Sequence, residues 1–162
     1  MRAGAACFGI LRTVALCLLL SSLTGCAGLP SLQARPHSTA DLDTGATWLG
    51  RTLSAGSVAH PGKSGVHALA DGRNAFAARV LLAQAAERTL DVQYYTWHKD
   101  MTGTLLFAAL REAADRGVRV RLLLDDQGTS GLDTLLSALD AHPEIEIRLF
   151  NPFVVRNMRI LG

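Results

Sequence analysis

The fold is decided between Thr89 and Phe153, where the chain reads TLDVQYYTWHKDMTGTLLFAALREAADRGVRVRLLLDDQGTSGLDTLLSALDAHPEIEIRLFNPF. Short runs rich in β-branched and aromatic residues alternate here with longer runs whose apolar residues recur at helical spacing. We expect strands over Leu90–Trp97, Val118–Leu124 and Ile145–Phe150. Strands and helices that alternate in this way indicate parallel strands joined by crossover helices. The sequence therefore predicts an α/β fold with a mostly parallel sheet.

Capping residues and helix breakers predict where the helices begin and end. Asp71 precedes an amphipathic run over Arg73–Glu87, and Asp100 precedes a second run that Arg116–Gly117 should end. Ser130 stands at capping-box spacing from Asp133, which predicts the start of a third helix. A short edge strand is also expected, over Val66–Ala70.

The first 25 residues have the pattern of an export leader. Arg2 and Arg12 provide the positive charge, and the apolar run Thr13–Leu23 is too short to span a bilayer. The run ends in Leu-Thr-Gly-Cys26, which resembles the lipobox of bacterial lipoproteins. We therefore predict lipid attachment at Cys26; the alternative is an ordinary secretory leader that contains a cysteine. Ala27 follows the cysteine, and by analogy with the sorting of bacterial lipoproteins a residue other than Asp at this position favours the outer membrane, if the organism has one.

The remaining chain divides into two parts. Residues 26–65 are rich in Gly, Ser, Thr, Pro and Ala without a sustained period, which predicts a flexible tether. Residues 66–162 carry the strands and helices. Since the leader holds two of the 16 basic residues and none of the 14 acidic ones, the rest of the chain is formally neutral. This balance argues against nucleic acid as a partner.

The expected strand ends are polar or aromatic. They read Tyr94–His98, Asp125–Gln127 and Asn151–Phe153, and the carboxyl ends of parallel strands are where ligands bind in such sheets. Gln93 and Tyr95 are candidates for lining a ligand pocket at this edge, with sheet packing as the alternative. Asp125 and Asp126 suggest a Mg²⁺ site, but no further oxygen ligands are identifiable from spacing, so loop capping is preferred and no metal ligand is assigned.

Three segments of the chain carry a family resemblance. They are Leu90-Asp-Val-Gln-Tyr-Tyr95, Gly117-Val-Arg-Val-Arg-Leu-Leu-Leu-Asp-Asp126 and Arg148-Leu-Phe-Asn-Pro-Phe153. In this order they resemble the opening of the first catalytic domain of the phospholipase D superfamily, and within it the bacterial cardiolipin synthases of the C type. The resemblance implies two such domains, phosphatidyl transfer between phospholipids through a phospho-histidine, and no metal or other cofactor. It also implies phospholipid substrates at a membrane, and Gln93 and Tyr95 would then be the candidates for lining a headgroup pocket.

The catalytic residues of that family are not found in these 162 residues. The family uses His-x-Lys, in which residues i and i+2 of an extended segment point to the same side. The two lysines, Lys63 and Lys99, are preceded two places earlier by Pro61 and Trp97, and His98–Lys99 are adjacent. We therefore assign no catalytic residue and interpret the chain as the N-terminal part of such an enzyme, inactive alone.

Two other functions stay open. One is a superfamily phosphodiesterase, for example a nuclease; the other is a non-catalytic surface lipoprotein that uses an α/β module for binding.

Overall fold

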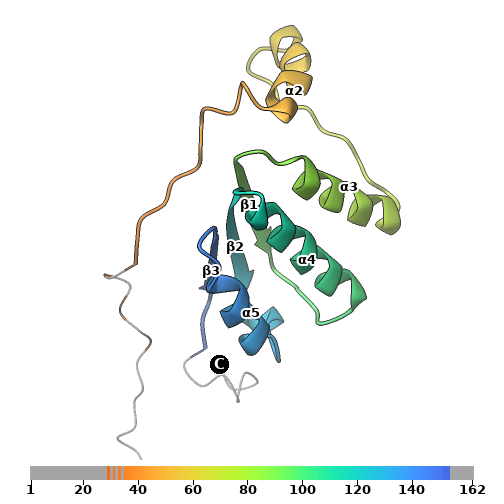
Figure 1. Ribbon diagram of the computed structural model, residues 1–162. Helices are drawn as coiled ribbons and strands as arrows, with labels where there is room; N and C mark the ends of the chain where they lie inside the picture. Colours follow the sequence, from red (N-terminus) through yellow and green to blue (C-terminus); the bar gives the residue numbers. More distant parts are fainter. Residues whose placement is uncertain (1–28, 30, 32, 34, 154–162) are drawn as a thin grey trace, which may run out of the picture. The chain divides into compact units, whose positions relative to one another are not determined.

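The computed structural model describes residues 29, 31, 33 and 35–153. Contacts between Cα atoms divide the chain into one unit that ends at Arg35 and a second that begins at Pro36, and the second is described below. Its sheet contains three parallel strands in the order β1 (Thr89–Tyr94), β2 (Arg119–Asp125) and β3 (Ile145–Phe150). The predicted α/β class with a parallel sheet is confirmed (Figure 1).

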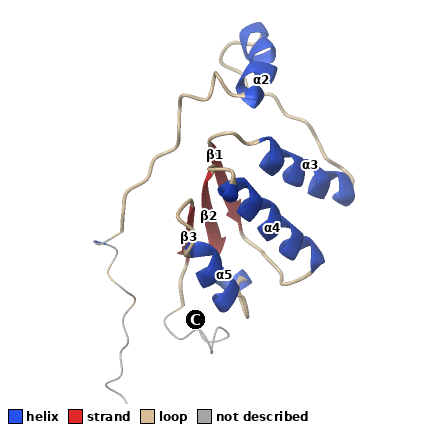
Figure 2. Cartoon of the chain, in the orientation of Figure 1, coloured by secondary structure: helices blue, strands red, loops and turns tan. Residues whose placement is uncertain are grey.

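Helices cover one face of this sheet. Helix α4 (Met101–Asp115) packs on β2, α5 (Asp133–Asp140) packs on β3, and α3 (Gly72–Ala85) packs against α4 (Figure 2). Alternate residues of the central strand form the middle of the core, where Val120, Leu122 and Leu124 are almost fully buried. Each such side chain contributes about 1.5–3 kcal/mol by leaving water. The apolar alternation seen in the sequence of β2 therefore identifies the covered face.

The predicted caps begin two of the helices. The carboxylate of Asp71 accepts hydrogen bonds from the backbone N–H groups of Arg73 and Asn74, at 3.0 and 2.9 Å. The carboxylate of Asp100 accepts one from Gly103 N at 2.8 Å. Gly117 follows α4 with φ of 88°, a left-handed conformation that glycine adopts without steric cost. These contacts confirm the predicted starts of α3 and α4 and the predicted stop after Arg116.

Two sequence predictions of local structure are wrong. Ser130 does not cap α5: the N-cap residue is Leu132, which makes no side-chain capping bond. Gly131, with φ of 75°, turns the chain between Ser130 and the helix, and the buried Leu132 side chain fixes the helix start instead. Val66–Ala70 forms no strand. Val66 is 93% exposed, so the segment gains no apolar burial that would offset the cost of ordering it.

A helix that the sequence did not predict lies within the expected tether. Helix α2 covers Trp48–Ala59, and Thr47 caps it by accepting a hydrogen bond from Gly50 N at 3.0 Å. No residue of α2 is buried. The helix is nevertheless linked to the domain at its first residue, because Trp48 N donates to the Glu87 carboxylate at 3.1 Å. Residues 26–65 are therefore not uniformly irregular in structure.

Candidate functional site

The carboxyl ends of the three strands meet at one edge of the sheet. Asn151, which follows β3, donates from its side-chain amide to the Asp125 carboxylate at 3.4 Å. Phe153 N donates to the Asp126 carboxylate at 2.8 Å. On the other side, a Cβ atom placed on Gly128 would lie 2.9 Å from the carbonyl oxygen of Tyr95, so the loop after β2 lies directly against the end of β1. The polar strand ends are thus brought together.

The two carboxylates at this edge hold turns. Asp125 Oδ1 accepts from Gln127 N at 2.9 Å, at the start of the short 3₁₀ helix η2 (Asp126–Gly128). Asp126 is fully buried and accepts from the Thr129 hydroxyl at 2.8 Å, in addition to Phe153 N. These bonds support the preferred interpretation, loop capping. Among the residues with described positions, no group of three or more His, Cys, Asp or Glu side chains is arranged to hold a metal ion.

The letters His98-Lys99-Asp100 belong to the turn between β1 and α4. Strand β1 ends at Tyr94, and both His98 and Lys99 are exposed beyond it. Asp100 caps α4, and the pKa of its carboxyl lies below its usual value because Gly103 N and then the Thr102 hydroxyl donate hydrogen bonds to it. Nothing in this arrangement gives His98 a lysine partner on the same side of a strand.

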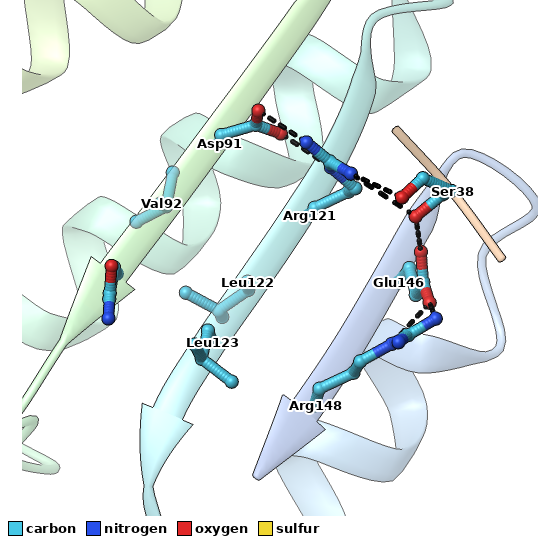
Figure 3. A pocket seen from close by; sticks show the side chains of 9 residues that line it. Ser38, Asp91, Val92, Arg121, Leu122, Leu123, Glu146 and Arg148 are labelled. Atoms are coloured by element: carbon cyan, nitrogen blue, oxygen red, sulfur yellow. Dashed lines mark hydrogen bonds and ion pairs between the residues drawn. The ribbon is translucent and has the colours of Figure 1, made fainter. Parts of the chain in front are cut away.

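A second polar region lies on the face of the sheet opposite the helices. An open cavity of about 280 Å³ there is lined mainly by polar side chains from all three strands and by Ser38 (Figure 3). The polar residues are Ser38, Asp91, Gln93, Arg121, Glu146 and Arg148. Apart from Ser38, these residues alternate along their strands with the residues of the covered face, so the same periodicity that builds the core places these charges together.

Paired charges dominate this cavity. Arg121 lies opposite Asp91 in the strand register and binds its carboxylate with two nitrogens, Nε at 2.6 Å from Oδ1 and Nη2 at 2.5 Å from Oδ2. The hydrogen bond lowers the pKa of Asp91 and raises that of Arg121. With two arginines and two carboxylates, the cavity has no net formal charge, which does not favour capture of an isolated phosphate anion.

Glu146 shows a balance of opposing effects. Partial burial raises the pKa of its carboxyl, but hydrogen bonds from Ser38 and Arg148 and the charges of Arg148 and Arg121 together bring it below the usual value. The Ser38 hydroxyl donates to Glu146 at 2.9 Å, and Arg148 Nε donates at 2.6 Å. The carboxylate therefore stays ionised at neutral pH and joins Ser38 to the sheet.

The two candidate headgroup residues lie in different places. Gln93 lines the open-face cavity, whereas Tyr95 is 73% exposed beyond the end of β1 and is not among the residues that line it. Their neighbour Tyr94 packs edge-on against Trp97, with ring centroids 4.8 Å apart. Cys26 lies outside the described residues. The roles of Gln93, Tyr95 and Cys26 stay predictions.

The open-face charges were not predicted as a group. A signal for them was present, because Arg119 and Arg121 alternate with buried residues of β2, and Arg121 lies opposite Asp91 in β1 and Glu146 in β3. Recognising the set would have required the register between strands, which the sequence alone does not fix.

The domain is an α/β unit with a parallel sheet and polar strand ends, and it is similar to part of several curated proteins. It is 62% identical over 103 residues to cardiolipin synthase C of Escherichia coli, a phospholipase D-like protein, a match that covers 64% of this chain and 22% of that protein. The expected resemblance to the C-type cardiolipin synthases is therefore confirmed. An uncharacterized protein of Helicobacter pylori is 32% identical over 133 residues, covering 82% of this chain and 26% of its own length.

The chain spans about a quarter of the length of these curated relatives. No protein-family description matches it. A solved structure of TrmBL2, an archaeal chromatin protein, is 18% identical in sequence to this chain. The match covers 65% of this chain and 42% of the TrmBL2 chain, and its TM-score of 0.39 is too low to relate the two proteins. Within the described part of the chain, every helix is too short or too polar to cross a membrane.

Proposed function

We propose that this chain is the N-terminal scaffold of a phospholipase D-like phosphatidyltransferase that resembles cardiolipin synthase. The observation that carries the proposal is the 62% identity over 103 residues to cardiolipin synthase C of Escherichia coli. At that level of identity we expect the shared segment to have the same fold in both proteins.

The described residues would act in this enzyme by positioning other groups. Phosphatidyl transfer through a phospho-histidine needs a nucleophilic His and a Lys that stabilises charge on the phosphoryl oxygens. These 162 residues contain no His-x-Lys. What they supply is a sheet whose carboxyl edge is fixed by Asp125, Asp126 and Asn151. The chain alone is therefore proposed to be inactive, and to need a His-x-Lys segment from elsewhere.

Substrate and membrane contacts extend this proposal. Gln93 and Tyr95 are the candidates for contact with the phospholipid headgroup. A lipid on Cys26 would anchor the exported protein to a membrane, which would be the outer membrane in a Gram-negative organism. Mass spectrometry of the mature N-terminal peptide tests the anchor. Acyl chains on Cys26, together with release of a Cys26→Ser variant from membranes, support it; an unmodified cysteine contradicts it.

The activity is tested by comparing two proteins on two substrates. One protein is the 162-residue chain; the other is the chain extended by whatever reading frame follows the Gly162 codon. Each is incubated with phosphatidylglycerol vesicles and, separately, with DNA. Cardiolipin formed only by the extended protein supports the proposal. DNA cleavage without lipid turnover would instead identify a nuclease. A frame that stops at Gly162, with the short product folded in membranes, would identify a non-catalytic lipoprotein.

A further inference from the structure

Four arginines hold one stretch of backbone. Within the predicted tether, residues Pro36–Asp43, here called the strap, present carbonyl oxygens to guanidinium groups of the domain. We call these four residues, which come from the sheet and the residue before it, the arginine row. The pairs are Arg148 with Pro36 O at 2.7 Å, Arg121 with Ser38 O at 3.0 Å, Arg119 with Thr39 O at 2.8 Å, and Arg88 with Asp43 O.

Side chains reinforce the strap at two points. The Ser38 hydroxyl donates to Glu146 and accepts from Arg121 at 3.3 Å (Figure 3). Arg88 also lies 3.4 Å from the Asp43 carboxylate and 3.9 Å from that of Asp41. Hydrogen bonds from charged donors are stronger than neutral ones. The strap is thus bound along its length, from its first residue to its last.

We infer that the strap shortens the tether between a lipid on Cys26 and the domain, and so sets how far the domain can move from the membrane. This inference rests on the anchor in the proposed function. With the strap bound, only residues 27–35 remain between Cys26 and the domain unit. Nine residues span about 30 Å at full extension, and about 17 Å on average if flexible.

A free tether would behave differently. If all of residues 26–65 were flexible, the mean span would be about 35 Å and the full extension about 130 Å. Binding of the strap therefore halves the mean distance and reduces the maximum about fourfold. It keeps the domain within about 30 Å of the bilayer surface, a distance similar to the thickness of the hydrocarbon core of the bilayer.

Two insertions of equal length separate these cases. A ten-residue Gly/Ser segment is inserted after Leu29, upstream of the strap, or after Gly62, beyond α2. The mature lipidated chain is labelled at Ser137→Cys, an exposed position on α5, and reconstituted in vesicles that carry a headgroup-linked acceptor dye. The bound strap predicts that only the upstream insertion lowers energy transfer, because it raises the mean span from about 17 to about 24 Å. Equal losses from both insertions would overturn the inference.

Variants of the arginine row provide a second test. A variant in which all four arginines of the row are replaced by Gln should lower energy transfer without any insertion, and should make the Gly62 insertion effective. Arg111→Gln is the matched control, since Arg111 lies on α4 and pairs with Asp115 instead. Unchanged transfer in the variant that lacks all four arginines contradicts the inference; if that variant unfolds, the insertion pair alone decides. An unmodified Cys26 would also overturn the inference. Cardiolipin formation is measured separately, so a failure of the transferase proposal can be distinguished from a failure of this inference.

Discussion

Gly103 offers the sharpest test of the packing at the start of α4. It is the third residue of the helix, where alanine would ordinarily be preferred because it loses less backbone entropy. A Cβ atom there would lie 2.1 Å from the carbonyl oxygen of His98 and 2.9 Å from Nε1 of Trp97. Both obstacles are fixed: one is backbone, and the Trp97 ring is stacked on Phe107 with centroids 4.2 Å apart. The methyl group can be accommodated only if the β1–α4 turn moves.

The expected size follows from two opposing effects. Replacing glycine by alanine inside a helix gains up to about 1 kcal/mol. Overpacking costs about 1–3 kcal/mol, and a 2.1 Å approach to backbone places Gly103→Ala toward the upper end. The net loss in the free energy of unfolding should therefore be about 2 kcal/mol. Gly72, the first residue of α3, has nothing within 4 Å of such a Cβ atom, so Gly72→Ala should be neutral or stabilising.

Urea unfolding followed by circular dichroism measures both variants against the parent chain. The reasoning requires a lower midpoint for Gly103→Ala and an equal or higher one for Gly72→Ala, with the same dependence on urea. If Gly103→Ala were as stable as the parent, the described approach of Gly103 to His98 would be wrong.

Three further changes test the core, the open face and a helix cap. Leu124→Ala should cost about 2–5 kcal/mol in urea unfolding because Leu124 is 1% exposed, whereas Leu123→Ala, on the open face, should cost clearly less. Asp91→Asn should lose less than about 1 kcal/mol at neutral pH, since its partner Arg121 is partly exposed. The pKa of Asp91 is below its usual 3.8, so its stabilisation is present above about pH 4 and disappears as the pH falls through the lowered pKa; a difference from the parent that does not shrink as the pH falls below about 4 would contradict this. Asp71→Ala should lower the midpoint by an amount worth about 1 kcal/mol and Asp71→Asn should restore most of it, because both capping bonds need only a side-chain oxygen.

The covered half of the fold could be read from the sequence because local and long-range preferences agree there. The apolar alternation of Val120, Leu122 and Leu124 reflects burial under α4, and the caps at Asp71 and Asp100 depend only on residues two or three places away. Predictions of this kind need no knowledge of which segments meet.

The other half depends on contacts between distant residues. The pairing of Arg121 with Asp91 requires the strand register, and the strap is bound mainly through carbonyl groups, which every residue has. Helix α2 has no buried residue, and its Gly, Ser and Thr residues are typical of loops, so its sequence resembles a tether. At Ser130 the spacing was right, but the burial of Leu132 decided where the helix began.

Recognition of carbonyl groups has an evolutionary consequence for the strap. Because the arginine row binds main-chain oxygens, most side chains between Pro36 and Asp43 are free to drift without loss of binding, with Ser38 as the principal exception through Glu146. Selection would instead fall on the arginines, which lie more than 40 positions away in sequence. An arginine such as Arg119 could then be retained in relatives whose strap sequences no longer look alike.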